Sequence, residues 1–144
     1  MSEINFFSED TDFSFHEADR ATEWLLLIGR KYKKEIGNLS IIFCSDTYLH
    51  QINVDYLQHD DLTDIITFPY EEKEIDVVSG DIFISVERVR ENAAVYEVSM
   101  EKELKRVMAH GLLHLCGYKD KTHEEKTIMR HQEDQAIKLW DEIT

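Results

Sequence analysis

The segment from residue 104 to residue 120 constrains the fold more than any other part of the sequence. Its apolar residues recur every three or four positions, which is the spacing of one face of an α-helix. They are Leu104, Val107, Met108, Leu112 and Leu115. Leu113 lies on the opposite side of the predicted helix, so we expect this helix to be central in its domain. Gly117 adopts positive φ readily and is expected to end the helix.

Two histidines lie on one flank of this predicted helix. At about 100° of rotation per residue, His110 and His114 lie roughly 40° apart and one turn from each other, a spacing at which two imidazoles can hold one metal ion. After the glycine turn, Asp120 or His123 can return as a third ligand, which leaves one position for water, as in catalytic metal sites. The histidines also have a simpler interpretation as core or surface residues, because a chain this rich in histidine contains such a pair by chance about one time in three.

Two known kinds of zinc site fit this helix poorly. Zincin proteases place a glutamate general base directly after the first histidine, but Gly111 occupies that position here. A closed structural zinc site needs a fourth ligand, for which Cys116 is the nearest candidate. Helical geometry turns Cys116 roughly 140° away from the midpoint of the histidines, so we expect a buried thiol instead.

The segment His110–Tyr118 resembles the signature of the YbeY family, His-Gly-x-Leu-His-Leu-x-Gly-Tyr-Asp-His, at every specified position up to the tyrosine. Members of that family are bacterial metal-dependent endoribonucleases implicated in rRNA maturation. The chain departs from the signature at its end, where Lys119-Asp120 replaces Asp-His. The resemblance therefore implies a metal held by the two histidines and Asp120, with His123 as the competing third ligand.

Three further segments resemble family blocks in their order and spacing: Asn53–Tyr56, Thr63–Phe68 and Gly80–Ile82. The arginine that follows the first block in the family is Leu57 here, and leucine cannot donate a hydrogen bond to phosphate. Phosphate binding is then expected from other cations. The candidates are Arg88, Arg90 and Lys119.

Length and composition indicate one domain spanning residues 1–144, because 42% of the residues are hydrophobic. No apolar run approaches the about 20 residues that cross a bilayer, and the N-terminus does not resemble a signal peptide. Cys44 and Cys116 are too few for a disulfide framework. We therefore expect a cytoplasmic protein with no membrane partner.

The formal charge of −14 opposes binding to RNA unless cations gather locally. Residues 30–34 contain four cations, although cations at the end of a helix are equally explained by the helix dipole. A second group surrounds the predicted metal helix and has the stronger claim to a role in binding. Its members are Lys102, Lys105, Arg106, Lys119 and Lys121.

The hydrophobic pattern predicts an α/β (α+β) fold, with about four strands in a small mixed sheet and about five helices. Strands are predicted at residues 4–7, 39–44, 64–70 and 80–85. Pro69 indicates an edge position for the third of these strands. Together, residues 4–7 and the alternating Phe13 and Phe15 indicate one or two short strands near the N-terminus.

Helices are predicted from residue 17 to a stop at Gly37–Asn38, and over residues 46–57 and 87–96. Ser99 is expected to cap the metal helix, and Thr122 begins a capping box for a last helix. That box places His123 in a helical first turn, which limits its reach and favours Asp120 as the third ligand.

The resemblance implies a single-strand-specific endoribonuclease that uses one Zn²⁺, or another divalent transition metal, per chain. Its partners would be rRNA and ribosomal particles rather than DNA, and its roles 16S rRNA maturation and ribosome quality control. In this hypothesis His110, His114 and Asp120 act through a metal-bound water that zinc makes more acidic. Glu103, on the same helical face, either orients a ligand, accepts a proton or is simply solvated.

Two other functions remain open. Leu57 and the acidic charge favour a ribosome-associated assembly factor whose metal is mainly structural and whose nuclease activity is weak or absent. Two histidines and a carboxylate also bind iron in non-haem oxygenases, which metal analysis would distinguish from a zinc hydrolase.

Overall fold

The computed structural model describes residues 2–57 and 63–143. Within these residues the chain forms one four-stranded mixed sheet and five helices, which confirms the predicted α/β fold. The elements, in chain order, are β1 (Glu3–Glu9), α1 (Ala18–Lys31), β2 (Glu35–Cys44), α2 (Asp46–Leu57), β3 (Ile65–Pro69), β4 (Val77–Ser85), α3 (Val86–Val95), α4 (Met100–Leu115) and α5 (His123–Glu142). None of the helices described is long and apolar enough to span a membrane.

The sheet has the strand order β1-β2-β4-β3. Strands β1, β2 and β4 are parallel, and β3 pairs antiparallel with β4 at the edge. The edge position suits Pro69, which has no backbone N–H to donate to a neighbouring strand. Strand β2 lies between β1 and β4, and its last four residues, Ile41–Cys44, are buried, as a continuous apolar run predicts.

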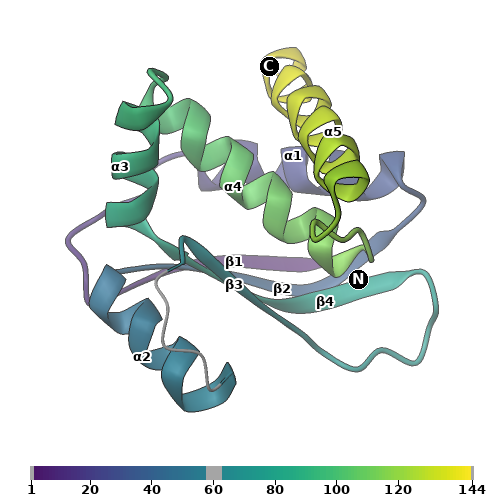
Figure 1. Cartoon of the computed structure of the whole chain (residues 1–144). Helices are drawn as coiled ribbons and strands as arrows, with labels where there is room; N and C mark the ends of the chain where they lie inside the picture. The colour runs from purple at the N-terminus through teal and green to yellow at the C-terminus, as the bar shows by residue number, and fades with distance from the viewer. Residues whose placement is uncertain (1, 58–62, 144) are drawn as a thin grey trace.

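Helices cover both faces of the sheet (Figure 1). α1, α3, α4 and α5 lie on one side, and α2 lies on the other. The apolar stripe of α4 joins the main core, where Met108 and Leu112 are fully buried together with Ile82 of β4. A smaller cluster of Cys44, Leu49 and Ile66 lies on the α2 side. α4 is therefore the central helix of the domain.

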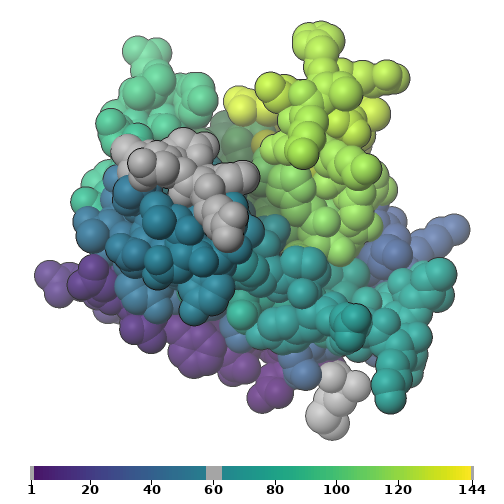
Figure 2. All heavy atoms as spheres, turned by 60° about the horizontal axis from the view of Figure 1, so that its bottom comes forward, coloured from purple at the N-terminus to yellow at the C-terminus, as the bar shows by residue number. Residues whose placement is uncertain are grey.

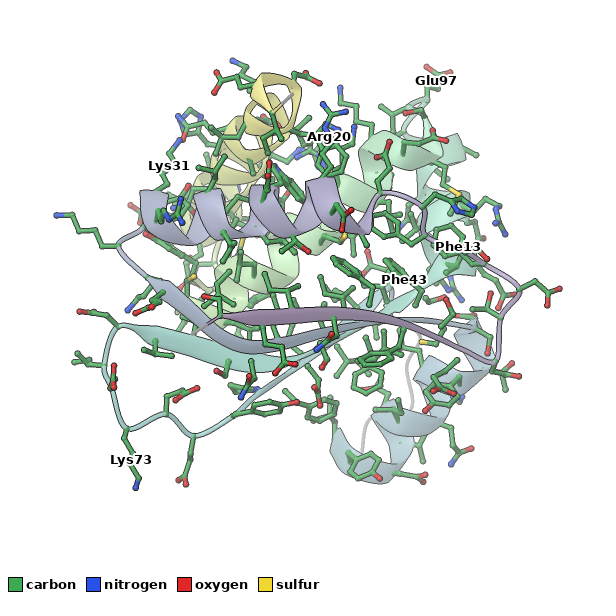
Figure 3. All side chains as sticks on the ribbon, turned by 180° about the vertical axis from the view of Figure 1, so that it is seen from behind. Phe13, Arg20, Lys31, Phe43, Lys73 and Glu97 are labelled. Carbon is green, nitrogen blue, oxygen red and sulfur yellow. The ribbon has the colours of Figure 1, made fainter. Side chains whose placement is uncertain are left out.

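The predicted second N-terminal strand is wrong. Phe13 and Phe15 lie in the connection between β1 and α1, which is not a strand. Both rings pack on Phe43, with centroid distances of 5.1 Å in each pair, on the helix side of the sheet (Figure 3). The alternation of the two phenylalanines therefore reflects core contacts of an irregular segment, not pairing in the sheet.

The predicted end of the first helix is also wrong. α1 ends at Lys31. Lys33, and not a glycine, makes the following turn, with a positive φ of 60°. The amide of Lys34 donates to the carbonyl of Gly29 at 2.8 Å and closes that turn. Gly37 lies inside β2, where a Cβ atom would collide with the hydroxyl of Ser79. Close packing within the sheet, not a helix stop, explains this glycine.

Candidate metal centre

α4 carries both histidines in its last two turns. Ser99 caps the helix, and its hydroxyl accepts a hydrogen bond from the amide of Lys102, as predicted. At the other end, Gly117 has φ of 105°, and the amide of Tyr118 donates to the carbonyl of Leu113 at 3.0 Å. The chain turns back at the predicted glycine and returns toward the histidines.

Three side chains meet where the chain returns. The Nε2 atoms of His110 and His114 lie 2.9 Å apart, and Oδ2 of Asp120 lies 3.2 Å from the first and 3.3 Å from the second. One ligand atom from each residue lies within 4.8 Å of the others, so this group can hold a metal ion. His123 instead begins α5 and is exposed on a shallow pocket of its outer surface.

The chemistry of these groups fits a divalent transition metal. Nδ1 of His110 lies 2.6 Å from Oε2 of Glu133, and a carboxylate can only accept, so Nδ1–H donates. In a neutral ring this leaves the lone pair of Nε2 facing the other two ligand atoms. Two imidazole nitrogens and one carboxylate oxygen are a ligand set of zinc and iron sites that keep an open position.

Glu133 links His110 to a wider ionic network. Its side chain is only 7% exposed, and its second oxygen accepts from Nη1 of Arg106 at 3.0 Å. Nη2 of Arg106 contacts Asp134 at 2.6 Å. Burial lowers the pKa of His110, but the hydrogen bond and charge of Glu133, with the charge of Asp120, outweigh burial and raise that pKa. The network therefore fixes the ring of His110 and increases its basicity.

Sequence reasoning missed Glu133, although the sequence contains a signal for it. On the predicted last helix, Glu133 lies between Met129 and Ala136, at the spacing of the buried stripe. A carboxylate on a buried stripe is rarely left without a partner. The partner is the histidine, and the contact exists only because α5 packs on α4.

Two further carboxylates border the group, of which Glu103 is buried and Asp64 is half-buried. Glu103 lines the same cleft as His110, and burial raises its pKa although Arg106 opposes the shift. Its predicted role of orienting a histidine is filled by Glu133. Asp64 lies at the start of β3, and burial raises its pKa against the opposing charge of His110.

Two open clefts meet at the histidines. One lies between α3, α4 and α5, has a volume of about 340 Å³ and contains Tyr96 and Arg130. The other lies between α2, β3 and α4, has a volume of about 360 Å³ and contains Leu57. Both are lined by Asp64, Ile65, His110 and Asp120. Figure 2 shows the surface hollowed between α3, at the upper left, and α5, at the upper right. Solvent and a substrate can therefore reach the three side chains.

None of the three cations predicted to bind phosphate is among the residues that line these clefts in the described part of the chain. Nε of Arg88 pairs with Asp46 at 3.1 Å, and Nη1 lies 3.8 Å from Glu91. Arg90 and Lys119 are exposed, and neither lines a cleft in the described part of the chain. Phosphate binding by these three cations therefore stays a prediction.

Gly111 and Cys116 have structural explanations. A Cβ atom on Gly111 would lie 2.9 Å from side-chain atoms of both Ile65 and Ile82, so this position faces the sheet and a glutamate there could not reach the histidines. Cys116 packs against the main core, and burial raises the pKa of its thiol to about 11. Neither residue supplies a ligand or a general base.

Comparison with known proteins agrees with this geometry. The sequence matches the family described as endoribonuclease YbeY over residues 3–141. Proteins named endoribonuclease YbeY from Flavobacterium johnsoniae and Cytophaga hutchinsonii are 50% and 49% identical, over 95% and 94% of this chain and 96% and 94% of their own lengths. The solution structure of TM1509 from Thermotoga maritima superposes with a TM-score of 0.69 at 27% identity, covering 97% of this chain and 91% of that one. The chain therefore belongs to the endoribonuclease YbeY family.

Proposed function

We propose that this chain is a metal-dependent endoribonuclease that hydrolyses phosphodiester bonds in single-stranded RNA. One observation carries the proposal: two imidazole nitrogens and the Asp120 oxygen converge within 3.3 Å of one another where two open clefts meet. The relatives named endoribonuclease share this chain almost end to end. The side chains that line the two clefts could contact the unpaired bases of a single strand, which supports single-stranded RNA as the substrate over a duplex.

His110, His114 and Asp120 are the proposed metal ligands, and Zn²⁺ is the proposed metal. When bound, the ion would supply charge to stabilise the phosphate oxygens and would increase the acidity of a water molecule. Glu133 holds the tautomer of His110 that leaves Nε2 free to bind. Arg106 holds Glu133 and offsets its charge, so the ligand geometry is fixed before RNA binds.

The biological part of the proposal extends the same activity. A cytoplasmic enzyme of this kind would act on 16S rRNA during its maturation and on ribosomal particles during quality control. The family's association with rRNA maturation supports this role.

The direct test is cleavage of a labelled single-stranded RNA by purified, zinc-loaded protein. We expect cleavage by the natural chain, its loss in His114→Ala, and its retention in His16→Ala, which removes an exposed histidine before α1. Circular dichroism would show that both variants are folded. Full activity in His114→Ala would exclude this site.

A second function is favoured by a specific observation. Leu57, which is 40% exposed, lines the cleft beside β3, and no cation among the described residues lines that cleft. The lack of cations in this cleft among the described residues, together with the formal charge of −14, favours a ribosome-associated assembly factor in which the metal is mainly structural. Co-sedimentation with ribosomal particles, without RNA cleavage at matched metal loading, would support this function over the nuclease.

A further inference from the structure

Cations line only one of the two clefts, as far as the described residues show. Arg106, Lys126 and Arg130 line the cleft between α3, α4 and α5. Arg106 is held by its ion pairs with Glu133 and Asp134 and is therefore not available to a ligand. Lys126 and Arg130 are exposed, and neither forms an ion pair within residues 2–57 and 63–143. With respect to the part of the chain that the structure describes, these two cations are available to bind an anion.

The geometry of α5 aligns these cations with the ligand group. Lys126, Arg130 and Glu133 lie at spacings of four and three residues, so they share one helical face. Glu133 on that face contacts His110. At 1.5 Å of rise per residue, Arg130 lies about 4.5 Å and Lys126 about 10 Å along the helix from Glu133. The positive charge therefore forms a row that ends beside the histidines.

The opposite wall of the same cleft offers a flat ring. Tyr96, at the end of α3, is 56% exposed, and Cζ of Arg130 lies 6.0 Å from the centroid of its ring. Asn92, one turn earlier, also lines the cleft and presents an amide. Exposed tyrosine rings and arginine guanidinium groups are surfaces on which unpaired RNA bases stack, and an amide can bind base edges.

Because the chain as a whole is negatively charged, a local group of cations is significant for the binding of RNA. The chain carries 30 acidic residues against 16 lysines and arginines, so most of its surface repels a polyanion. Lys126 and Arg130 also line a shallow pocket of α5, together with Thr127, His131 and the acidic Asp134. A strand that leaves the ligand group can therefore follow the cations from the cleft onto the helix surface.

We propose that the cleft between α3 and α5 binds the nucleotide next to the cleaved bond, with its base on Tyr96 and its phosphates on Arg130 and Lys126. This assignment rests on the function proposed above and names the residues that take over phosphate binding in a chain where Leu57 replaces the family arginine.

The test measures binding and cleavage separately on the full chain. Binding of a short fluorescent single-stranded RNA to metal-free protein is followed by anisotropy over a range of salt concentrations. The double variant Lys126→Gln/Arg130→Gln is expected to bind at least about tenfold more weakly, with a salt slope smaller by about 1.4, because each phosphate contact on a single strand contributes about 0.7.

Two single changes separate charge from stacking. Tyr96→Ala is expected to weaken binding by about fivefold or more without changing the salt slope, because stacking on an aromatic ring does not release counterions. Lys138→Gln is the matched control, since it removes one exposed cation of α5 that lines neither cleft. It is expected to leave the affinity unchanged. The replaced side chains are exposed, so thermal melting of all variants should match that of the natural chain.

Cleavage with zinc-loaded protein distinguishes the possible failures. The double variant should raise KM with little change in kcat. Natural affinity and salt slope in the double variant would overturn the assignment, even if the chain proves to be a nuclease. RNA binding that weakens as expected, in a chain that cleaves nothing, would support binding of a nucleotide by Tyr96, Arg130 and Lys126 but would contradict the nuclease and its cleaved bond. A natural chain that binds no single-stranded RNA would overturn both.

Discussion

The two histidines occupy unequal surroundings. His110 faces α5, where Glu133 accepts its Nδ1–H and Arg106 holds Glu133 in turn. His114 contacts His110 and Asp120, and the structure shows no carboxylate behind its ring among the residues it describes. On this side the cleft is lined by Leu57, by uncharged residues of β3 and by the carboxylate of Asp64, and no lysine or arginine among the described residues lines it.

The difference shows that α5 supplies both the order and the charge of the site. A carboxylate that accepts from a ligand histidine fixes its ring and makes it a better ligand. The same helix carries the cations that remain free at the cleft. The side formed by α2 and β3 supplies shape and little electrostatic attraction. Changes on the α5 side should therefore have larger effects than matched changes on the other side.

Among changes that leave the three ligands intact, the largest expected effect comes from Glu133→Gln. An amide cannot fix the histidine tautomer as a carboxylate does, and loss of such a partner lowers metal affinity by roughly 10–100-fold. The matched change on the other side is Thr63→Val, whose hydroxyl donates to the carbonyl of Ile65 and not to a ligand. Zinc competition with a coloured chelator should show the loss in the first variant and almost none in the second. Equal losses would contradict the asymmetry.

The next largest effect, on stability, is expected where α4 contacts the sheet. This contact is common to both sides of the site. Gly111→Ala should destabilise the chain by about 1–3 kcal/mol, because its Cβ would press on Ile65 and Ile82. Urea denaturation measures this change. Ala94→Gly, on the exposed surface of α3, offers a comparison in which only helix propensity is lost, at about 1 kcal/mol. An unchanged urea midpoint for Gly111→Ala would mean that α4 lies further from the sheet than the structure shows.

A smaller effect is expected when a cation is added to the α2 side, whose cleft no lysine or arginine among the described residues lines. Leu57→Arg should tighten binding of single-stranded RNA severalfold and increase the salt slope by about 0.7, since one phosphate contact is gained. Anisotropy measurements provide both values. If Leu57→Arg leaves the RNA affinity unchanged while Lys126→Gln lowers it, the RNA contacts α5 and does not contact the α2 side.

The smallest effect involves Glu103. Burial raises its pKa in the folded chain above the unfolded value, so the folded state binds the proton more tightly. The stability from this protonation is complete below the unfolded pKa and is lost as the pH rises through the folded pKa. Glu103→Gln should therefore stabilise the metal-free chain by about 1 kcal/mol or less near pH 8, and by less near pH 4. Urea midpoints at the two pH values check this; a loss of stability near pH 8 would contradict it.

Local sequence patterns predicted the parts of the site that are formed by residues close together in the sequence. The helical spacing of His110 and His114 and the glycine turn that returns Asp120 involve only a short segment, so periodicity and turn chemistry were sufficient. Glu133 comes from a separate helix, and its role exists only after α5 packs on α4. The same holds for the cleft formed by Tyr96 and Arg130, which lie far apart in the sequence.

The errors in the fold have a related cause. Phe13 and Phe15 alternate as strand residues do, but their rings are held by Phe43 from another part of the chain. Gly37 resembles a helix stop, yet the space it leaves is used by Ser79 of a neighbouring strand. In both places a tertiary contact determines what a local pattern means.

Zinc titration of the metal-free chain tests the central claim most directly. The ligand geometry predicts one ion per chain for the natural protein and for His16→Ala, and an affinity at least about 100-fold lower for His114→Ala, because a direct ligand contributes more than its supporting partner. Unchanged stoichiometry and affinity in His114→Ala would show that His110, His114 and Asp120 do not hold the metal.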